Sequence, residues 1–245
     1  VQGGNRAIAR RLGLGWTGGG RIDRPEQAEP FAAELKAAGA DAASVHVGWG
    51  MESDEDIDRV VAAIIRASES HAVPIYVETH RATITQDIWR TVRMVERHPG
   101  IRLNADFSHW YTGLEMAYGD FEQKLTFLQP VFDRVRFVHG RIGNPSHMQV
   151  DVKDGTGLIF VDHFREMWTR SFVGFLRTAK PGDYISFNPE LLPAKIWYAR
   201  LFPRPDGTLD EETDRWQQAL VLTRIARACF AEAQARIARA GATTA

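Results

Sequence analysis

The sequence predicts a parallel α/β barrel of the (β/α)8 type, formed as a single domain over residues 1–245. Three observations predict this fold. Short β-branched runs alternate with amphipathic helical segments, which is typical of βαβ units. The predicted strands are almost continuously apolar, as strands covered on both faces are. The chain has 245 residues, 44% of them hydrophobic, which is enough for one sizeable core.

The predicted elements follow one another in regular order. Helices are expected over residues 26–38, 53–70, 85–97, 119–132, 161–178 and 211–239. Strands are expected over residues 43–48, 73–78, 101–106, 134–139 and 183–188. Ser53, with acidic residues after it, is an N-cap signal for the second helix, and Pro99 with Gly100 ends the third.

The number of strands is smaller than the fold requires. A barrel of this type needs eight βα units, whereas the pattern shows five convincing strands and a sixth near residues 12–16. We therefore expect one or two opening units to be missing from a chain that starts at Val1. A flat doubly wound sheet would normally carry a glycine-rich phosphate turn after an early strand. The run Gly18-Gly19-Gly20 lacks that context, so we expect a flexible loop there.

Composition disfavours several classes of function. The 30 basic and 31 acidic residues are mixed along the chain, which disfavours a nucleic-acid or membrane-surface partner. The single cysteine, Cys229, cannot form an internal disulfide and fits a reducing compartment. No stretch approaches 18 consecutive apolar residues, and no signal peptide pattern opens the chain. We expect a soluble, cytoplasmic protein.

Four metal-binding residue types lie at the ends of predicted strands. Glu78, Asp106 and His139 are the last residues of their runs, and Glu190 lies just beyond the run 183–188. The carboxyl ends of barrel strands meet at one rim, so these side chains are expected to converge. Three carboxylates and one imidazole form a mostly hard-oxygen site for a single divalent ion. Mn²⁺ is the first choice, with Mg²⁺, Co²⁺ or Zn²⁺ as alternatives.

These residues lie in motifs that resemble a known family. The segments ETHR at 78–81, DFSHW at 106–110, HGRIG at 139–143 and NPE at 188–190 resemble the xylose-isomerase-like barrel superfamily. That superfamily includes sugar isomerases, ketose 3-epimerases, inosose dehydratases and endonuclease IV. The resemblance covers roughly residues 40–200 and implies that the four strand-end residues are the metal ligands.

The resemblance also implies contacts to a sugar. His109 completes an Asp-x-x-His motif whose histidine reaches a substrate oxygen, and Arg141 resembles an arginine that holds a sugar hydroxyl or carbonyl. Trp110 and Trp49 are candidates for packing on a sugar ring, or equally for core packing. His46, at another strand end, and Gln149, in the long segment 140–160, are further candidates for the pocket, as are His80 and His147.

The implied activity is that of a metal-dependent isomerase or epimerase acting on a keto-sugar through an enediolate, with Glu78 and Glu190 as acid/base groups. The same site becomes a lyase or dehydratase on keto-sugars or keto-glycosides if the intermediate expels a leaving group, in one chain or as a subunit of a complex. An endonuclease-IV-like nuclease would need additional zinc ligands, which are not evident in the sequence. A non-catalytic sugar-binding barrel is the remaining hypothesis.

The protein is expected to assemble with other chains. Related barrels commonly form homo-oligomers, and the helix predicted over residues 211–239 is a candidate interface because it is long and partly apolar. A partner subunit that completes the barrel is the alternative, since the pattern shows fewer than eight βα units. The small-molecule partner expected is a sugar.

Overall fold

The computed structural model describes residues 3–243, and the chain divides into two compact units, Val1–Asn104 and Ala105–Ala245. The first unit holds four parallel strands that pair in chain order. These are β1 (Thr17–Ile22), β2 (Ala42–Val47), β3 (Ile75–Glu78) and β4 (Leu103–Ala105), whose last residue opens the second unit. The helices are α1 (Gly3–Arg11), α2 (Ala28–Ala38), α3 (Asp54–His71) and α4 (Ile88–Arg97), with a 3-10 turn, η1, at Pro25–Gln27.

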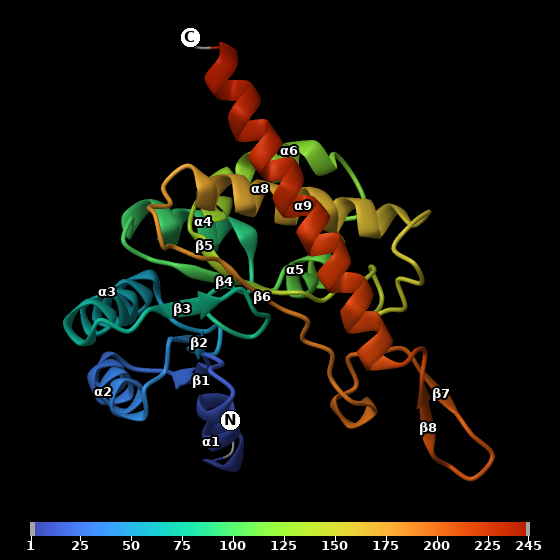
Figure 1. The fold of residues 1–245 in the computed structure, drawn as a ribbon, viewed down its shortest axis with the longest axis horizontal. Coiled ribbons are helices and arrows are strands. Elements are labelled where there is room, and N and C mark those ends of the chain that lie inside the picture. The colour runs from blue at the N-terminus through green and yellow to red at the C-terminus, as the bar shows by residue number, and fades with distance from the viewer. Residues whose placement is uncertain (1–2, 244–245) are drawn as a thin grey trace. The chain divides into compact units, whose positions relative to one another are not determined.

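Helix α3 shows why the helical predictions hold. Ser53 adopts an extended conformation and its side chain accepts a hydrogen bond from the Asp56 amide, so it is the N-cap that the sequence predicts. The acidic residues of the first turn complement the positive end of the helix dipole. The buried face packs with β3 and with α2, and α2 and α3 lie on the same side of β1–β3 in Figure 1.

Strand β1 corrects two predictions. The expected strand at 12–16 is a turn and irregular chain that follows α1, and the glycine run expected to be a loop is the strand itself. The reason is close packing: a Cβ atom on Gly20 would lie 2.6 Å from the Phe31 ring, and one on Gly18 would overlap Leu35. Because α2 lies so close to this strand, only glycine fits at both positions.

The second unit contains β5 (Val135–His139) and β6 (Ser186–Asn188), which are parallel, with His139 opposite Asn188. An antiparallel pair, β7 (Leu201–Pro203) and β8 (Leu209–Glu211), was not predicted. The helices are α5 (Ser108–Gly113), α6 (Phe121–Phe127), α7 (Gln129–Phe132), α8 (Ile159–Leu176) and α9 (Arg215–Thr243), with a 3-10 turn, η2, at Ala194–Ile196.

The predicted helix over 119–132 is two helices in the structure, because Pro130 lies in the first turn of α7, where a proline is tolerated, and the chain restarts there. Helix α9 crosses α8 and packs against it, as Figure 1 shows. Arg236 of α9 forms two hydrogen bonds, of 2.9 and 2.8 Å, to the Glu166 carboxylate of α8. Arg170, one turn further along α8, bonds to the same carboxylate at 2.8 Å and so helps to orient the acid that joins α8 to Arg236 of α9.

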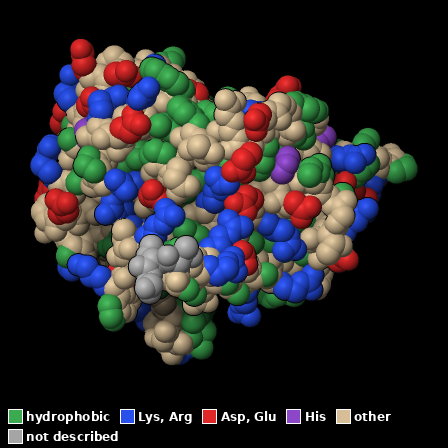
Figure 2. All heavy atoms as spheres, turned by 90° about the horizontal axis from the view of Figure 1, so that it is seen from above, with side chains coloured by type: hydrophobic (Ala, Val, Ile, Leu, Met, Phe, Trp, Pro, Cys, Tyr) green, Lys and Arg blue, Asp and Glu red, His purple; other side chains and the backbone are tan. Residues whose placement is uncertain are grey.

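The fold-class prediction is confirmed. Within residues 3–243, six strands are of the parallel type and follow one another in chain order with helices between them, which is a TIM-barrel-like α/β arrangement with fewer than eight βα units. None of the helices in this range is both long and apolar enough to cross a membrane. Acidic and basic side chains are interspersed over the face in Figure 2, in keeping with the net charge of −1.

Candidate metal centre

Three of the four predicted ligands lie together in the second unit. His139 is the last residue of β5, Asp106 follows β4 directly, and Glu190 lies two residues beyond β6. Each offers a ligand atom within 4.8 Å of those of the other two. The Asp106 side chain is fully buried, that of His139 is 9% exposed, and that of Glu190 is 29% exposed. The cluster is therefore open to solvent mainly on the side of Glu190.

Arg141 lies between the two carboxylates of this cluster. Its Nη2 donates to Asp106 Oδ2 and, at 2.7 Å, to Glu190 Oε2. Burial alone would lower the pKa of the guanidinium, but the charges of Asp106 and Glu190 outweigh burial, and the pKa lies above its ordinary value. Arg141 is thus a permanent cation at this site. Sequence reasoning assigned it to the substrate and missed its pairing with the ligands.

Hydrogen bonds fix the orientation of Asp106. The Ser108 hydroxyl donates to Asp106 Oδ1 at 2.5 Å, and Arg141 Nε in turn donates to the Ser108 oxygen at 3.1 Å. His109 is fully buried, with its Nε2 3.7 Å from Asp106 Oδ2, and its ring packs edge-on against Tyr198. The Asp-x-x-His motif therefore brings its acid and its histidine together, as expected. Ser108 and Tyr198 carried no signal in the sequence.

Gln149 holds the segment that follows Glu190. Its amide nitrogen donates to the Leu192 carbonyl at 3.2 Å, and its oxygen accepts from the Leu192 amide at 2.8 Å. Both polar groups of the Gln149 side chain are thus hydrogen-bonded to the backbone of the segment that follows Glu190. Trp110 is fully buried and packs against Phe107 in the core. The contacts of Gln149 and Trp110 with a sugar remain predictions.

Glu78 ends β3 in the first unit and has its own set of neighbours. Its Oε2 accepts hydrogen bonds from Ser44 Oγ at 2.9 Å and from Asn104 Nδ2 at 3.3 Å. Its Oε1 lies 3.5 Å from His46 Nε2. That Glu78 joins the three residues of the second unit remains a prediction. Trp49 is 53% exposed, and the Arg21 guanidinium lies 3.8 Å from the centroid of its ring.

The donor set of the second unit fits a divalent metal ion. Two carboxylates and one imidazole, at the ends of strands and with a hydrogen-bonded carboxylate, provide hard oxygen donors and one nitrogen donor. Asp106 is buried and bonded to the guanidinium of Arg141, and its carboxylate oxygens are the kind of donor that a hard divalent ion prefers. Asp106, His139 and Glu190 are thus the residues of this unit that would hold the ion.

Comparison with known proteins supplies no family. No protein-family model matches the chain, and no curated protein matches it. Several solved structures are similar, and three of them are described here. A probable 3-DHS dehydratase, AsbF, from Bacillus anthracis is 16% identical with a TM-score of 0.49, covering 79% of this chain and 77% of that one. The 3-keto-D-glucoside 4-epimerase YcjR from E. coli is 14% identical with a TM-score of 0.45, covering 79% and 80%.

The third similar structure is an uncharacterised protein from Parabacteroides distasonis, 18% identical with a TM-score of 0.42, covering 77% of this chain and 69% of that one.

Proposed function

We propose that the protein is a divalent-metal-dependent isomerase or epimerase that acts on a keto-sugar through an enediolate. The observation that carries the proposal is the meeting of Asp106, His139 and Glu190 at strand ends, with Arg141 bound to both carboxylates. When bound, a divalent ion would polarise two adjacent oxygens of a hydroxy-ketone and make the hydrogen on the carbon between them more acidic.

The residues of the chain would then move the proton. Glu190 is the partly exposed carboxylate of the cluster, so it is the group that a substrate could reach, whereas Asp106 is fully buried and suited to holding the ion. Glu190 would remove a carbon-bound proton and return it. Glu78 is proposed as the second acid/base group and fourth ligand. His109 and Arg141 are proposed to contact substrate oxygens, and Mn²⁺ is the proposed ion.

The test is metal analysis of the purified full chain, followed by exchange of substrate hydrogen with deuterated water over a panel of keto-sugars. We expect about one equivalent of metal and exchange without loss of a leaving group. Glu115→Gln, which alters an exposed carboxylate of the second unit, serves as the control for Glu190→Gln. Metal-loaded protein that exchanges hydrogen on no member of the panel would contradict the proposal. Release of water or of an aglycone would instead assign a lyase.

A further inference from the structure

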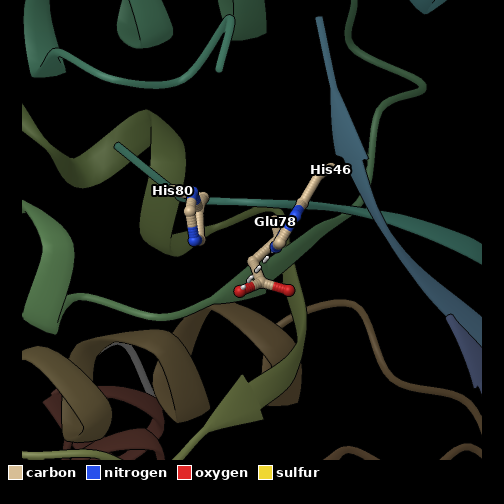
Figure 3. Close-up of side chains that lie close together, drawn as sticks. All are labelled: His46, Glu78 and His80. Atoms are coloured by element: carbon tan, nitrogen blue, oxygen red, sulfur yellow. Dashed lines mark ion pairs between the residues drawn. The ribbon is translucent and has the colours of Figure 1, made fainter. Parts of the chain in front are cut away.

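A second group of metal-binding side chains lies wholly within the first unit. His46 of β2, Glu78 at the end of β3 and His80, two residues further along, offer ligand atoms within 4.8 Å of one another (Figure 3). Val45 is paired with Val77 in the parallel sheet, so His46 and Glu78 are the next residues on neighbouring strands. The sheet itself therefore places the first two groups side by side.

The distance between His46 and Glu78 favours coordination over a direct hydrogen bond. His46 Nε2 and Glu78 Oε1 are 3.5 Å apart, which is longer than the usual 2.7–3.2 Å of an N–H···O bond. Two donors of a tetrahedral zinc site, each about 2.1 Å from the ion, are separated by about 3.4 Å. The two atoms are thus spaced as two ligands of one ion would be.

A hydrogen bond orients the His80 ring. His80 Nδ1 contacts the carbonyl oxygen of Arg81, and because a carbonyl can only accept, Nδ1 is the donor. Nε2 is then the ring nitrogen that is left to bind an ion. A ring N–H donated to a backbone carbonyl is the usual support for a metal-bound histidine. The His80 amide donates to Thr85 Oγ1 at 3.0 Å, which fixes the backbone that carries the ring.

The Glu78 carboxylate is oriented in the same manner. Ser44 and Asn104 both donate to Oε2, and Asn104 Nδ2 also donates to Ser44 Oγ at 2.7 Å. These bonds direct Oε1 toward His46. The His46 and His80 rings contact each other, with their centroids 4.1 Å apart and at 38°, so both imidazoles lie near the same carboxylate.

The geometry points to a binding site for one zinc-like transition-metal ion, formed by His46, Glu78 and His80. Two imidazole nitrogens and one carboxylate oxygen are a donor set that zinc accepts while a fourth position stays open for water or a substrate oxygen. The His46 side chain is 34% exposed, so the ion has a route from solvent. The donor set does not include Asp106, His139 or Glu190 of the second unit, although Glu78 is also proposed above as a ligand of the other ion. The inference does not depend on the proposed sugar chemistry.

The test uses the full chain with Asp106→Asn and His139→Gln, which remove donors of the second unit. Titration with Zn²⁺, and with Co²⁺ followed by visible absorption, should show one ion per chain. Adding His46→Gln or His80→Gln should weaken binding by at least about tenfold, since loss of even an outer-shell partner has that effect. The control is His71→Gln, a histidine of α3 bonded to Glu29 at 2.6 Å, which should leave the affinity unchanged.

Nitrogen NMR of the histidine rings in the unmutated chain is a second measurement, and its result does not depend on whether the variants fold. On addition of Zn²⁺, the rings of His46 and His80 should shift, whether or not His139 of the second unit also responds. The proposal is overturned if the chain binds no Zn²⁺, if both histidine variants bind it within about twofold of their parent, or if other histidines shift instead. Since no step measures catalysis, failure of the sugar proposal would leave these readouts unaltered.

Discussion

The two units use strand ends in the same way but surround them with different chemistry. In the first unit, Glu78 lies beside two imidazoles, and its second oxygen is bound by neutral donors, a hydroxyl and an amide. In the second, Asp106 and Glu190 share the charged Arg141. A parallel sheet thus determines where the candidate ligands meet, whereas neighbouring side chains determine whether the donors are mainly imidazole nitrogens or carboxylate oxygens paired with a cation.

The largest effect is expected from Glu190→Gln, which keeps the shape of the side chain but removes the base. If Glu190 transfers the proton, exchange of substrate hydrogen with solvent should fall by about 10²–10⁴-fold. Deuterium incorporation followed by mass spectrometry measures the rate. Glu78→Gln in parallel shows whether the carboxylate of the first unit acts in the same reaction: an equal loss would place it there, and an unchanged rate would remove it.

Removing Arg141 should show how much stability the protein loses when two carboxylates no longer have their cationic partner. In metal-free protein, Arg141→Ala is expected to lower the free energy of unfolding by about 3–5 kcal/mol, because Asp106 is buried and would lose its charge partner. Urea denaturation measures the loss. Arg141→Lys, which keeps the positive charge, should lose less.

The same variant also tests metal binding. Mn²⁺ should restore more stability to Arg141→Ala than it adds to the unmutated protein, because the ion replaces the missing charge. Equal stabilisation of both proteins, within about 0.5 kcal/mol, would argue that Arg141 and a metal ion do not occupy the same electrostatic position.

Two matched serine variants compare the hydrogen bonds that orient a candidate ligand in each unit. Ser44→Ala removes a donor to Glu78, and Ser108→Ala removes a donor to Asp106. We expect Ser44→Ala to weaken Zn²⁺ binding and Ser108→Ala to weaken Mn²⁺ binding, each by about 10–100-fold. Calorimetric titration of both variants with both ions gives the result. Identical profiles for the two variants would mean that the units do not bind separate ions.

The smallest effect concerns the acid stability of the second unit. Burial would raise the pKa of Glu166, but hydrogen bonds from Arg236 and Arg170 outweigh it and hold the pKa below the ordinary 4.5. A carboxylate with a lowered folded-state pKa contributes stability above pH 4.5, and that contribution is lost as the pH falls through the lowered value.

Glu166→Gln should therefore cost about 1 kcal/mol at neutral pH. The difference between the variant and the unmutated protein should shrink in acid, which thermal denaturation across pH can follow. A difference that stays constant down to the acid transition would contradict the ion-pair explanation. Glu115→Gln, at an exposed carboxylate, should show neither effect.

The strand-end positions of two candidate ligands could be predicted from the sequence because they depend on local order. Glu78 and His139 end apolar runs, and a strand end is a property of neighbouring residues. The strand at Gly18–Gly20 could not be predicted, because its reason lies in Phe31, a residue of another element. The pairing of Arg141 with Asp106 was missed for a similar cause, because it links positions far apart in the chain.

The reciprocal bonds between Gln149 and Leu192 have a consequence for Glu190. A side-chain amide carries the same donor and acceptor as a peptide group, so Gln149 completes for this segment the two-bond pairing that a neighbouring strand would make. An acid carried on irregular chain is thereby held in register, as if it stood in a sheet. The position of Glu190 thus depends on a glutamine more than forty positions earlier in the chain. A small change in the length of the side chain at Gln149 would therefore misalign the site.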